Sequence, residues 1–229
     1  MRLFLYNKEK IIKKQLNTAI AALFLATASM TAMATEVGGT YVTAGVMNVT
    51  YDGVNELATA GVTIDDSDRA PTFGIGYQVD ENLSLEAGVI GEADVSATLS
   101  GGESGTLYGR SYSLVGAATI KATTDTSYTL GVRYLEPVSE KLDLYGKAGV
   151  LFWDLTGSVG LNGTLTYAGT AYTVNTTADF YQNDGRDLYY GIGGSYELTK
   201  EASINVDYLN MEIDGDDVDG LSVAIEFDI

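Results

Sequence analysis

The last residues of the chain alternate strictly between apolar and polar side chains, and this pattern constrains the fold most. Leu221, Val223, Ile225, Phe227 and Ile229 fall on one face of an extended segment, and the residues between them on the other. A period of two is typical of a β-strand whose two faces meet different surroundings, whereas a helix repeats every 3.6 residues. The end of the chain is therefore predicted to be a strand with one apolar face.

The same alternation recurs along the chain and predicts eight strands. Their approximate ranges are 41–51, 72–79, 83–95, 128–134, 142–152, 190–198, 202–208 and 221–229. In the third of these, the odd-numbered residues up to Ala93 and Val95 are predicted to share one apolar face. In the first, neither face is clearly apolar. No other segment shows a dominant helical period of 3.6 residues. The fold class is therefore predicted to be all-β.

The connections between these strands alternate in length. Short turns are predicted at 80–82, 137–141 and 199–201, and longer connections at 52–69, 98–125, 157–185 and 214–218. This asymmetry is typical of outer-membrane barrels, whose turns are short on the periplasmic side and whose loops are long outside. The sequence therefore predicts an eight-stranded antiparallel up-and-down transmembrane β-barrel with extended extracellular hairpins.

Two of the long connections contain stretches rich in Thr, Val, Ala and Tyr. The stretches cover residues 112–124 and 161–174. Residues of these types favour strands, so the stretches are predicted to lengthen the hairpins beyond the membrane. A ten-stranded barrel is the alternative interpretation.

Aromatic residues are predicted to form two girdles at the ends of the strands, where rings prefer the membrane interface. Four lie near the short turns, at Tyr77, Tyr134, Tyr196 and Phe227. Six lie toward the opposite end, at Phe73, Tyr128, Phe152, Trp153, Tyr190 and Tyr208.

The N-terminus resembles an export signal. Five basic residues between 2 and 14 precede an apolar run at 18–31 and an A-x-A site at 32–34. Residues 1–34 are predicted to be a cleaved signal peptide and residues 35–229 the barrel domain. The alternative, a membrane anchor, is disfavoured because the apolar run is short. The sequence has no cysteine, so neither a lipid-bearing cysteine nor a disulfide is expected.

The formal net charge of the chain is −18. Removal of residues 1–34 would leave eight basic and 30 acidic residues, because five bases and one acid are lost. A polyanion of this kind argues against nucleic acid as a partner.

Two segments resemble strands of the OmpA-like transmembrane domain. Residues 142–153 are similar to its fifth strand, and residues 189–208 to its sixth and seventh strands. The resemblance is continuous over 126–156 and 186–229 and weaker over 41–97. It implies an outer-membrane location, in contact with lipid and lipopolysaccharide. The chain ends at the eighth strand, so the family's peptidoglycan-binding domain is not expected.

The resemblance also implies that the barrel-assembly machinery reads a signal in the last strand. The residues that match this signal are Val223, Ile225, Phe227 and Ile229. Ile229 departs from the terminal Phe that is usual in the family.

Four charged residues are predicted to point into the barrel because they alternate with apolar neighbours: Glu86, Arg133, Lys147 and Asp207. The resemblance places an acid on the third strand opposite bases on the fourth and fifth, which Glu86, Arg133 and Lys147 match. Charges in a narrow barrel must be paired or hydrated, and eight strands leave only the space that side chains fill. A polar plug is therefore predicted rather than a conducting pore.

The composition excludes several catalytic chemistries. The chain contains neither His nor Cys, which removes nucleophilic systems and zinc sites that depend on them. Neither a catalytic activity nor a cofactor is expected. The acidic stretches 65–68 and 214–219 could gather divalent cations, but a solvated acidic surface is the favoured interpretation and no metal site is predicted.

Three functions agree with these features. The leading hypothesis is a structural outer-membrane protein that contributes to envelope integrity. The second is a surface adhesin or receptor that uses the connections 98–125 and 157–185 to hold an extracellular ligand. The third is a narrow, low-conductance porin.

Overall fold

A computed structural model describes residues 37–51 and 62–229. The predicted signal peptide, residues 1–34, and the first part of the connection predicted at 52–69 lie outside the described residues. The described residues contain no helix that is long and apolar enough to cross a membrane.

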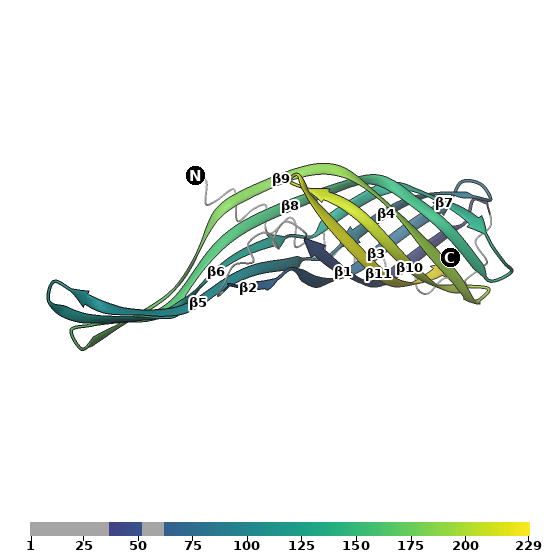
Figure 1. The fold of residues 1–229 in the computed structure, drawn as a ribbon. Coiled ribbons are helices and arrows are strands. Elements are labelled where there is room, and N and C mark those ends of the chain that lie inside the picture. Colours follow the sequence, from purple (N-terminus) through teal and green to yellow (C-terminus); the bar gives the residue numbers. More distant parts are fainter. Residues whose placement is uncertain (1–36, 52–61) are drawn as a thin grey trace.

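The described part of the chain forms eleven β-strands (Figure 1). Their bounds are β1 (Thr40–Tyr51), β2 (Val62–Asp65), β3 (Ser67–Gln78), β4 (Leu83–Ile90), β5 (Ala93–Leu107), β6 (Arg110–Thr124), β7 (Ser127–Pro137), β8 (Leu142–Tyr167), β9 (Thr170–Thr199), β10 (Ala202–Ile213) and β11 (Asp216–Asp228).

Eight of these strands close into a ring. In order around the ring they are β1, β3, β4, β7, β8, β9, β10 and β11, and every neighbouring pair is antiparallel. The last strand returns to the first, with Tyr41 opposite Asp228 and Tyr51 opposite Val218. The predicted eight-stranded antiparallel barrel is confirmed. The ten-stranded alternative is wrong, because β5 and β6 pair beyond the ring.

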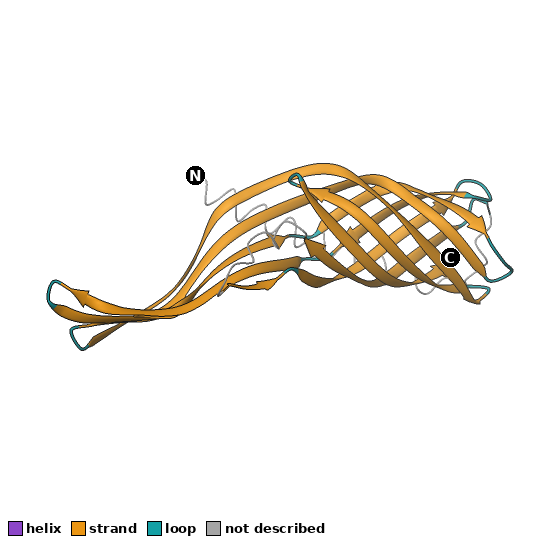
Figure 2. Cartoon of the chain, viewed as in Figure 1, coloured by secondary structure: helices purple, strands orange, loops and turns teal. Residues whose placement is uncertain are grey.

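The remaining strands build a sheet that continues from one end of the barrel (Figures 1 and 2). β5 pairs with β6, and β6 pairs with residues 155–167 of β8, which pair in turn with β9. The short β2 pairs with residues 96–99 of β5. We call this sheet the outer extension. The connections predicted at 98–125 and 157–185 are thus strands almost to their tips, as extended hairpins.

The tips of the long hairpins are two-residue turns. Both turn residues have positive φ at Tyr108–Gly109, Ala168–Gly169 and Asp214–Gly215. This backbone matches the right-handed twist of the flanking strands and is the favoured way to close a two-residue hairpin. Tight tips leave almost every outer residue in a strand, which is why the extension is a sheet.

At the opposite end of the barrel the connections are short and held by side chains. In the turn between β3 and β4, the Asp80 carboxylate accepts hydrogen bonds from the backbone N–H of Asn82 (2.9 Å) and of Leu83 (2.8 Å). The C-terminus lies at this end, away from the extension (Figure 1). The short-turn end is the periplasmic end of an outer-membrane barrel.

The outward face of the ring is apolar. Large side chains on it are at least a third exposed, including Val46, Phe73, Ile75, Leu85, Leu130, Tyr134, Ile192, Val206, Val223 and Phe227. An exposed apolar band of this kind suits lipid. Trp153, predicted in the outer aromatic girdle, is only 5% exposed and points inward, so that prediction is wrong.

A break between β4 and β5 exchanges the two faces of the sheet. Ile90 is buried inside the barrel, and residues 91–92 leave the strand pattern. After the break Ala93 and Val95 are buried on the inner side, at 3% and 2% exposure. The prediction that these two residues share the outer face of 83–89 is wrong, because residues 91–92 break the extended pattern and the alternation resumes one residue out of step, with odd-numbered residues inward.

Candidate functional site

The structure brings the four predicted inward charges together in the half of the barrel nearer the short turns. The Lys147 ammonium lies between two acids, 3.2 Å from Glu86 Oε2 and 3.3 Å from Asp207 Oδ1. Arg133 Nε lies 3.5 Å from Glu86 Oε1. Strands β4, β7, β8 and β10 contribute one residue each, so the contacts link strands along one side of the lumen.

A fifth charged residue, Glu226 of β11, makes the shortest contact in this group. Its Oε2 lies 2.6 Å from Arg133 Nη1 and accepts a 2.9 Å hydrogen bond from Asn205 Nδ2. Alternation in the last strand indicates that Glu226 points inward, but its partner was not predicted. The partner depends on how the ring closes, since 93 residues separate Glu226 from Arg133.

Two tyrosines complete the surroundings of Arg133. Its guanidinium lies 4.3 Å from the centre of the Tyr41 ring and 5.3 Å from that of Tyr145. The Tyr41 hydroxyl donates a 2.7 Å hydrogen bond to Glu86. Tyr41 fits only because its ring lies over Gly76, where an added Cβ would overlap it. Arg133 is consequently 2% exposed and held by two acids and two rings.

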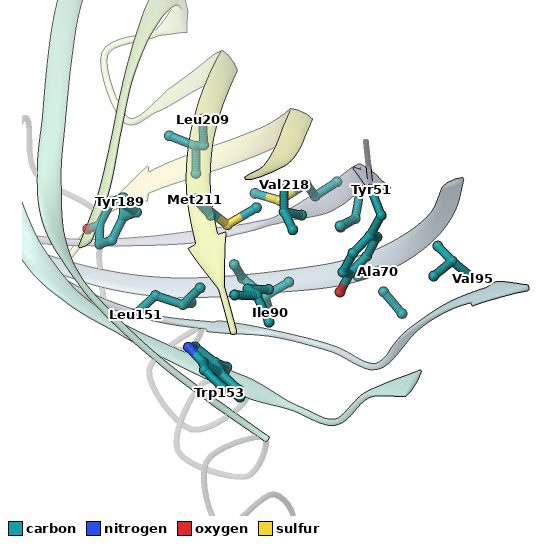
Figure 3. Close-up of a cluster of buried hydrophobic side chains, with 14 residues drawn as sticks. Tyr51, Ala70, Ile90, Val95, Leu151, Trp153, Tyr189, Leu209, Met211 and Val218 are labelled. Carbon is teal, nitrogen blue, oxygen red and sulfur yellow. The ribbon is translucent and has the colours of Figure 1, made fainter. Parts of the chain in front are cut away.

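The half of the barrel nearer the extension contains an apolar cluster (Figure 3). Its largest members are Met47, Tyr51, Ile90, Leu151, Trp153, Tyr189, Leu209, Met211, Ile213 and Val218. Trp153 Nε1 donates a 2.7 Å hydrogen bond to Asp187, and the Tyr51 hydroxyl bonds that of Thr124. Apolar residues of β1 therefore point inward at this end, which explains why the first predicted strand has no clear apolar face.

A small pocket lies where the polar and apolar layers meet. Its volume is about 90 Å³, and its lining includes Glu86, Lys147 and Asp207 together with Met47 and Leu209. A space of this size holds a few water molecules. It is much smaller than the 300–1,000 Å³ of typical ligand pockets.

The outer extension reverses the polarity of the barrel wall. On its inner face, which continues the lumen side, apolar side chains are exposed: Leu99 (53%), Ile120 (49%), Leu161 (46%), Leu165 (37%), Tyr172 (55%) and Val174 (45%). A groove of about 450 Å³ runs over this face, with Gly116, Ala118 and Gly163 among its lining residues. The inner face of the extension is therefore an apolar surface outside the lipid-facing band.

The outer face of the extension is mostly polar. Cross-strand contacts on it join Lys121 Nζ to Asp94 Oδ2 at 2.6 Å and the hydroxyls of Thr98 and Thr119 at 2.9 Å. Threonine and charge replace the apolar band of the ring. This change indicates that the outer face leaves lipid and enters water where the extension begins.

The acidic stretch 214–219 lies at a hairpin tip, where Asp214 is engaged with neighbouring side chains. Asp214, at the tip between β10 and β11, accepts hydrogen bonds from Tyr181 (2.5 Å) and Asn183 (2.7 Å). In residues 37–51 and 62–229, no three acidic side chains are grouped so that they could hold a metal ion.

Three of the residues predicted to form the assembly signal lie on the outer face of β11, and Ile229 directly follows the strand. Val223, Ile225 and Phe227 are 54%, 44% and 46% exposed, and their side chains join the apolar band. The Ile229 backbone N–H donates a 2.8 Å hydrogen bond to Thr40, which ties the last residue to the first strand.

Comparisons with known proteins agree with this architecture. Residues 19–227 match the family described as outer membrane protein beta-barrel domain. No curated protein matches the chain.

Several solved structures are similar to the chain at low identity. One is Ail of Yersinia pestis in complex with the heparin analogue sucrose octasulfate (12% identity, 84% of this chain and 99% of that chain covered, TM-score 0.44). Another is the outer membrane protein OprG from Pseudomonas aeruginosa (14% identity, 86% and 98% covered, TM-score 0.49). A third is Neisserial surface protein A (12% identity, 82% and 96% covered, TM-score 0.43). Because the family match spans most of the sequence, the chain belongs to the outer membrane protein beta-barrel domain family and is a protein of the outer membrane.

Proposed function

We propose that this protein is a structural component of the outer membrane whose barrel does not pass solutes. The observation that carries the proposal is the placement of Arg133 between Glu86 and Glu226, which ties β7 to its neighbour β4 and, across the lumen, to β11. Each of these charges would be costly to bury alone, and pairing makes the arrangement stable. The apolar layer of Met211, Trp153 and their neighbours gives a second barrier, because ions cross apolar constrictions poorly.

Planar-bilayer recording tests this proposal. The purified protein is expected to give no steady single-channel conductance. A matched variant, Arg133→Ala with Met211→Ala, removes one side chain from each layer and is expected to conduct weakly. The folding control for this variant is a gel mobility that changes on boiling, as that of a folded barrel does. Steady channels in the unmodified protein would contradict the proposal and support a narrow porin.

The proposal includes the partners and the absence of catalysis. The apolar band would contact lipid and lipopolysaccharide, and the barrel-assembly machinery would read Val223, Ile225 and Phe227 on the outer face of β11, together with Ile229, which follows the strand. We propose no catalytic role, no cofactor and no nucleic-acid partner. The buried charges are engaged with one another, and a chain with 31 acidic and 13 basic residues repels polyanions.

A second function, binding of a protein at the cell surface, is favoured by the inner face of the outer extension. Its exposed apolar side chains, such as Leu161 and Val174, lie where the opposite face is polar and hydrated. Four strands paired over thirteen rows span on the order of 800 Å². That area is about what one partner contributes to a standard protein interface.

Shortening the extension tests this second function. Thr98, Thr119, Gly160 and Thr177 form one row across the four strands. Removing the residues above that row and closing each hairpin with Asn-Gly should leave the ring folded, as reported by heat-modifiable gel mobility. Loss of cell or matrix binding in the shortened protein supports surface binding, and unchanged binding contradicts it.

A further inference from the structure

The outer extension has a long open edge on β9. The side of β9 that faces away from β8 pairs with β10 only from Tyr189 to Thr199. Within the described residues, no strand pairs with residues 170–188 on that side. The tip at Asp214 bonds the side chains of Tyr181 and Asn183, so it covers the lower part of the edge. Residues 170–178 remain open, and all of them are exposed.

This open segment lacks the features that usually protect an edge strand. Natural edges carry charges, prolines or bulges that prevent pairing with another chain. Residues 170–178 read Thr-Ala-Tyr-Thr-Val-Asn-Thr-Thr-Ala, with neither charge nor proline. A bulge occurs only below them, where the register with β8 shifts between Gly157 and Ser158. By contrast, residues 100–107 on the opposite edge contain three glycines and an acid.

The order of residues in the segment suits pairing with itself. If two copies run antiparallel with Val174 opposite Val174, Tyr172 lies opposite Thr176 and Thr173 opposite Asn175. The even-numbered residues then share the apolar face and the odd-numbered residues the polar face, as in each copy alone. Aromatic with β-branched pairs stabilise antiparallel strands, and like charges opposite one another destabilise them. Asp179 would lie opposite Gly169, so no acid meets an acid.

We propose that residues 170–178 of β9 pair antiparallel with the same segment of a second copy that is anchored in an opposing membrane. An antiparallel pair makes the two extensions point in opposite directions, and each extension leads away from the mouth of its own barrel (Figure 1). The two barrels therefore lie at opposite ends of the joined sheet. An uncharged segment is also the part of a strongly acidic chain that two copies can bring together with least repulsion.

This inference rests on the second function proposed above and names its partner. Each contact is short, so the bridge depends on many copies that act together between two surfaces. Such a contact would join cells that carry the same protein.

Charge pairs at the centre of the contact test the inference in two populations of vesicles that contain the purified protein. Unmodified protein is expected to make the vesicles cluster, as measured by turbidity. Val174→Lys in both populations, or Val174→Asp in both, places like charges directly opposite each other and is expected to lower clustering about tenfold. Mixing Val174→Lys vesicles with Val174→Asp vesicles is expected to restore it. No clustering by the unmodified protein, or no restoration in the mixture, overturns the inference.

A disulfide between copies gives an independent measurement, because the chain has no cysteine of its own. Opposed residues in an antiparallel pair have Cα atoms about 4.5–5.5 Å apart, within the range of a disulfide. Val174→Cys with diamide as oxidant should therefore give a dimer that joins a tagged copy in one vesicle to an untagged copy in another. The control is Val115→Cys, which is 62% exposed and lies in the row next to that of Val174, opposite Thr164 and Thr173.

The outcomes separate this inference from the function on which it rests. Equal dimer yields from Val174→Cys and Val115→Cys, or dimers only between copies of one vesicle, overturn the self-pairing. A third outcome is that binding of other cells is lost when the extension is shortened but is unaffected by Val174→Lys. That result supports surface binding and overturns self-pairing. If shortening the extension changes neither clustering nor binding, both proposals fail.

Discussion

Replacement of Arg133 by methionine would remove the residue on which the polar layer depends. Methionine keeps most of the length of the side chain and adds no polar group. The described cluster contains three acids, Glu86, Asp207 and Glu226, and two bases. In Arg133→Met only Lys147 would remain to balance the three acids.

The expected loss of stability follows from the burial of this group. Arg133 is 2% exposed, and the Glu226 side chain is 10% exposed. Breaking a buried ion pair by removal of one partner costs about 3–5 kcal/mol. With a urea dependence of about 2 kcal/mol per M, a loss of about 4 kcal/mol lowers the unfolding midpoint by about 2 M. Trp153 is the single tryptophan and is buried, so its fluorescence reports unfolding directly.

A double variant separates the loss of the ion pair from a general loss of packing. Arg133→Met with Glu226→Gln restores the net charge of the cluster and is expected to recover part of the midpoint, because no carboxylate is then left without its partner. Arg110→Met, at an exposed arginine of the extension, serves as the matched control and should change stability by less than about 0.5 kcal/mol. A midpoint for Arg133→Met equal to that of the parent, or a double variant less stable than the single one, would refute the reasoning.

Three further predictions concern other parts of the molecule. Gly76→Val should lower the urea midpoint because its side chain would overlap the Tyr41 ring, and Gly76→Val with Tyr41→Ala should recover part of the loss; equal midpoints for parent and Gly76→Val would contradict this. Phe227→Ala should lower the folded fraction in outer membranes, seen as less heat-modifiable protein, while leaving refolding in detergent nearly unchanged; an equal loss in detergent would indicate a defect of the barrel itself. Tyr181 donates a hydrogen bond to Asp214, which raises the pKa of the tyrosine. This bond should therefore stabilise the tip below the ordinary tyrosine pKa of about 10 and be lost as pH rises through the higher folded value, which ultraviolet titration of the parent against Tyr181→Phe would measure.

The alternation of side chains predicts the ring well because it reflects a local cause. Each ring strand has lipid on one side and the lumen on the other, so a period of two appears within a few residues, as in 221–229. The same rule indicates that Glu86, Arg133, Lys147 and Asp207 point inward, and their side chains meet in the structure.

Features that depend on distant or irregular contacts could not be predicted in this way. The contact of Glu226 with Arg133 requires the closure of β11 on β1, which no local pattern contains. Ala93 and Val95 change faces because the break at residues 91–92 offsets the alternation by one residue, and Trp153 points into an apolar part of the lumen. An apolar residue there looks the same in the sequence as one that faces lipid.

Two strands, β8 and β9, are continuous from the periplasmic turn to the tip of the extension. They contain 26 and 30 residues, and they pair from Leu142 opposite Tyr196 to Tyr167 opposite Thr170. By contrast, residues 91–92 and 125–126 interrupt the other long hairpin at the rim of the barrel. A pull on the tip along the strands would therefore load this hairpin, whose strands continue through a single bulge at Gly157–Ser158, in shear, with many backbone hydrogen bonds sharing the force. The hairpin would therefore transmit a pulling force from the tip of the extension, past the rim, to the wall of the barrel.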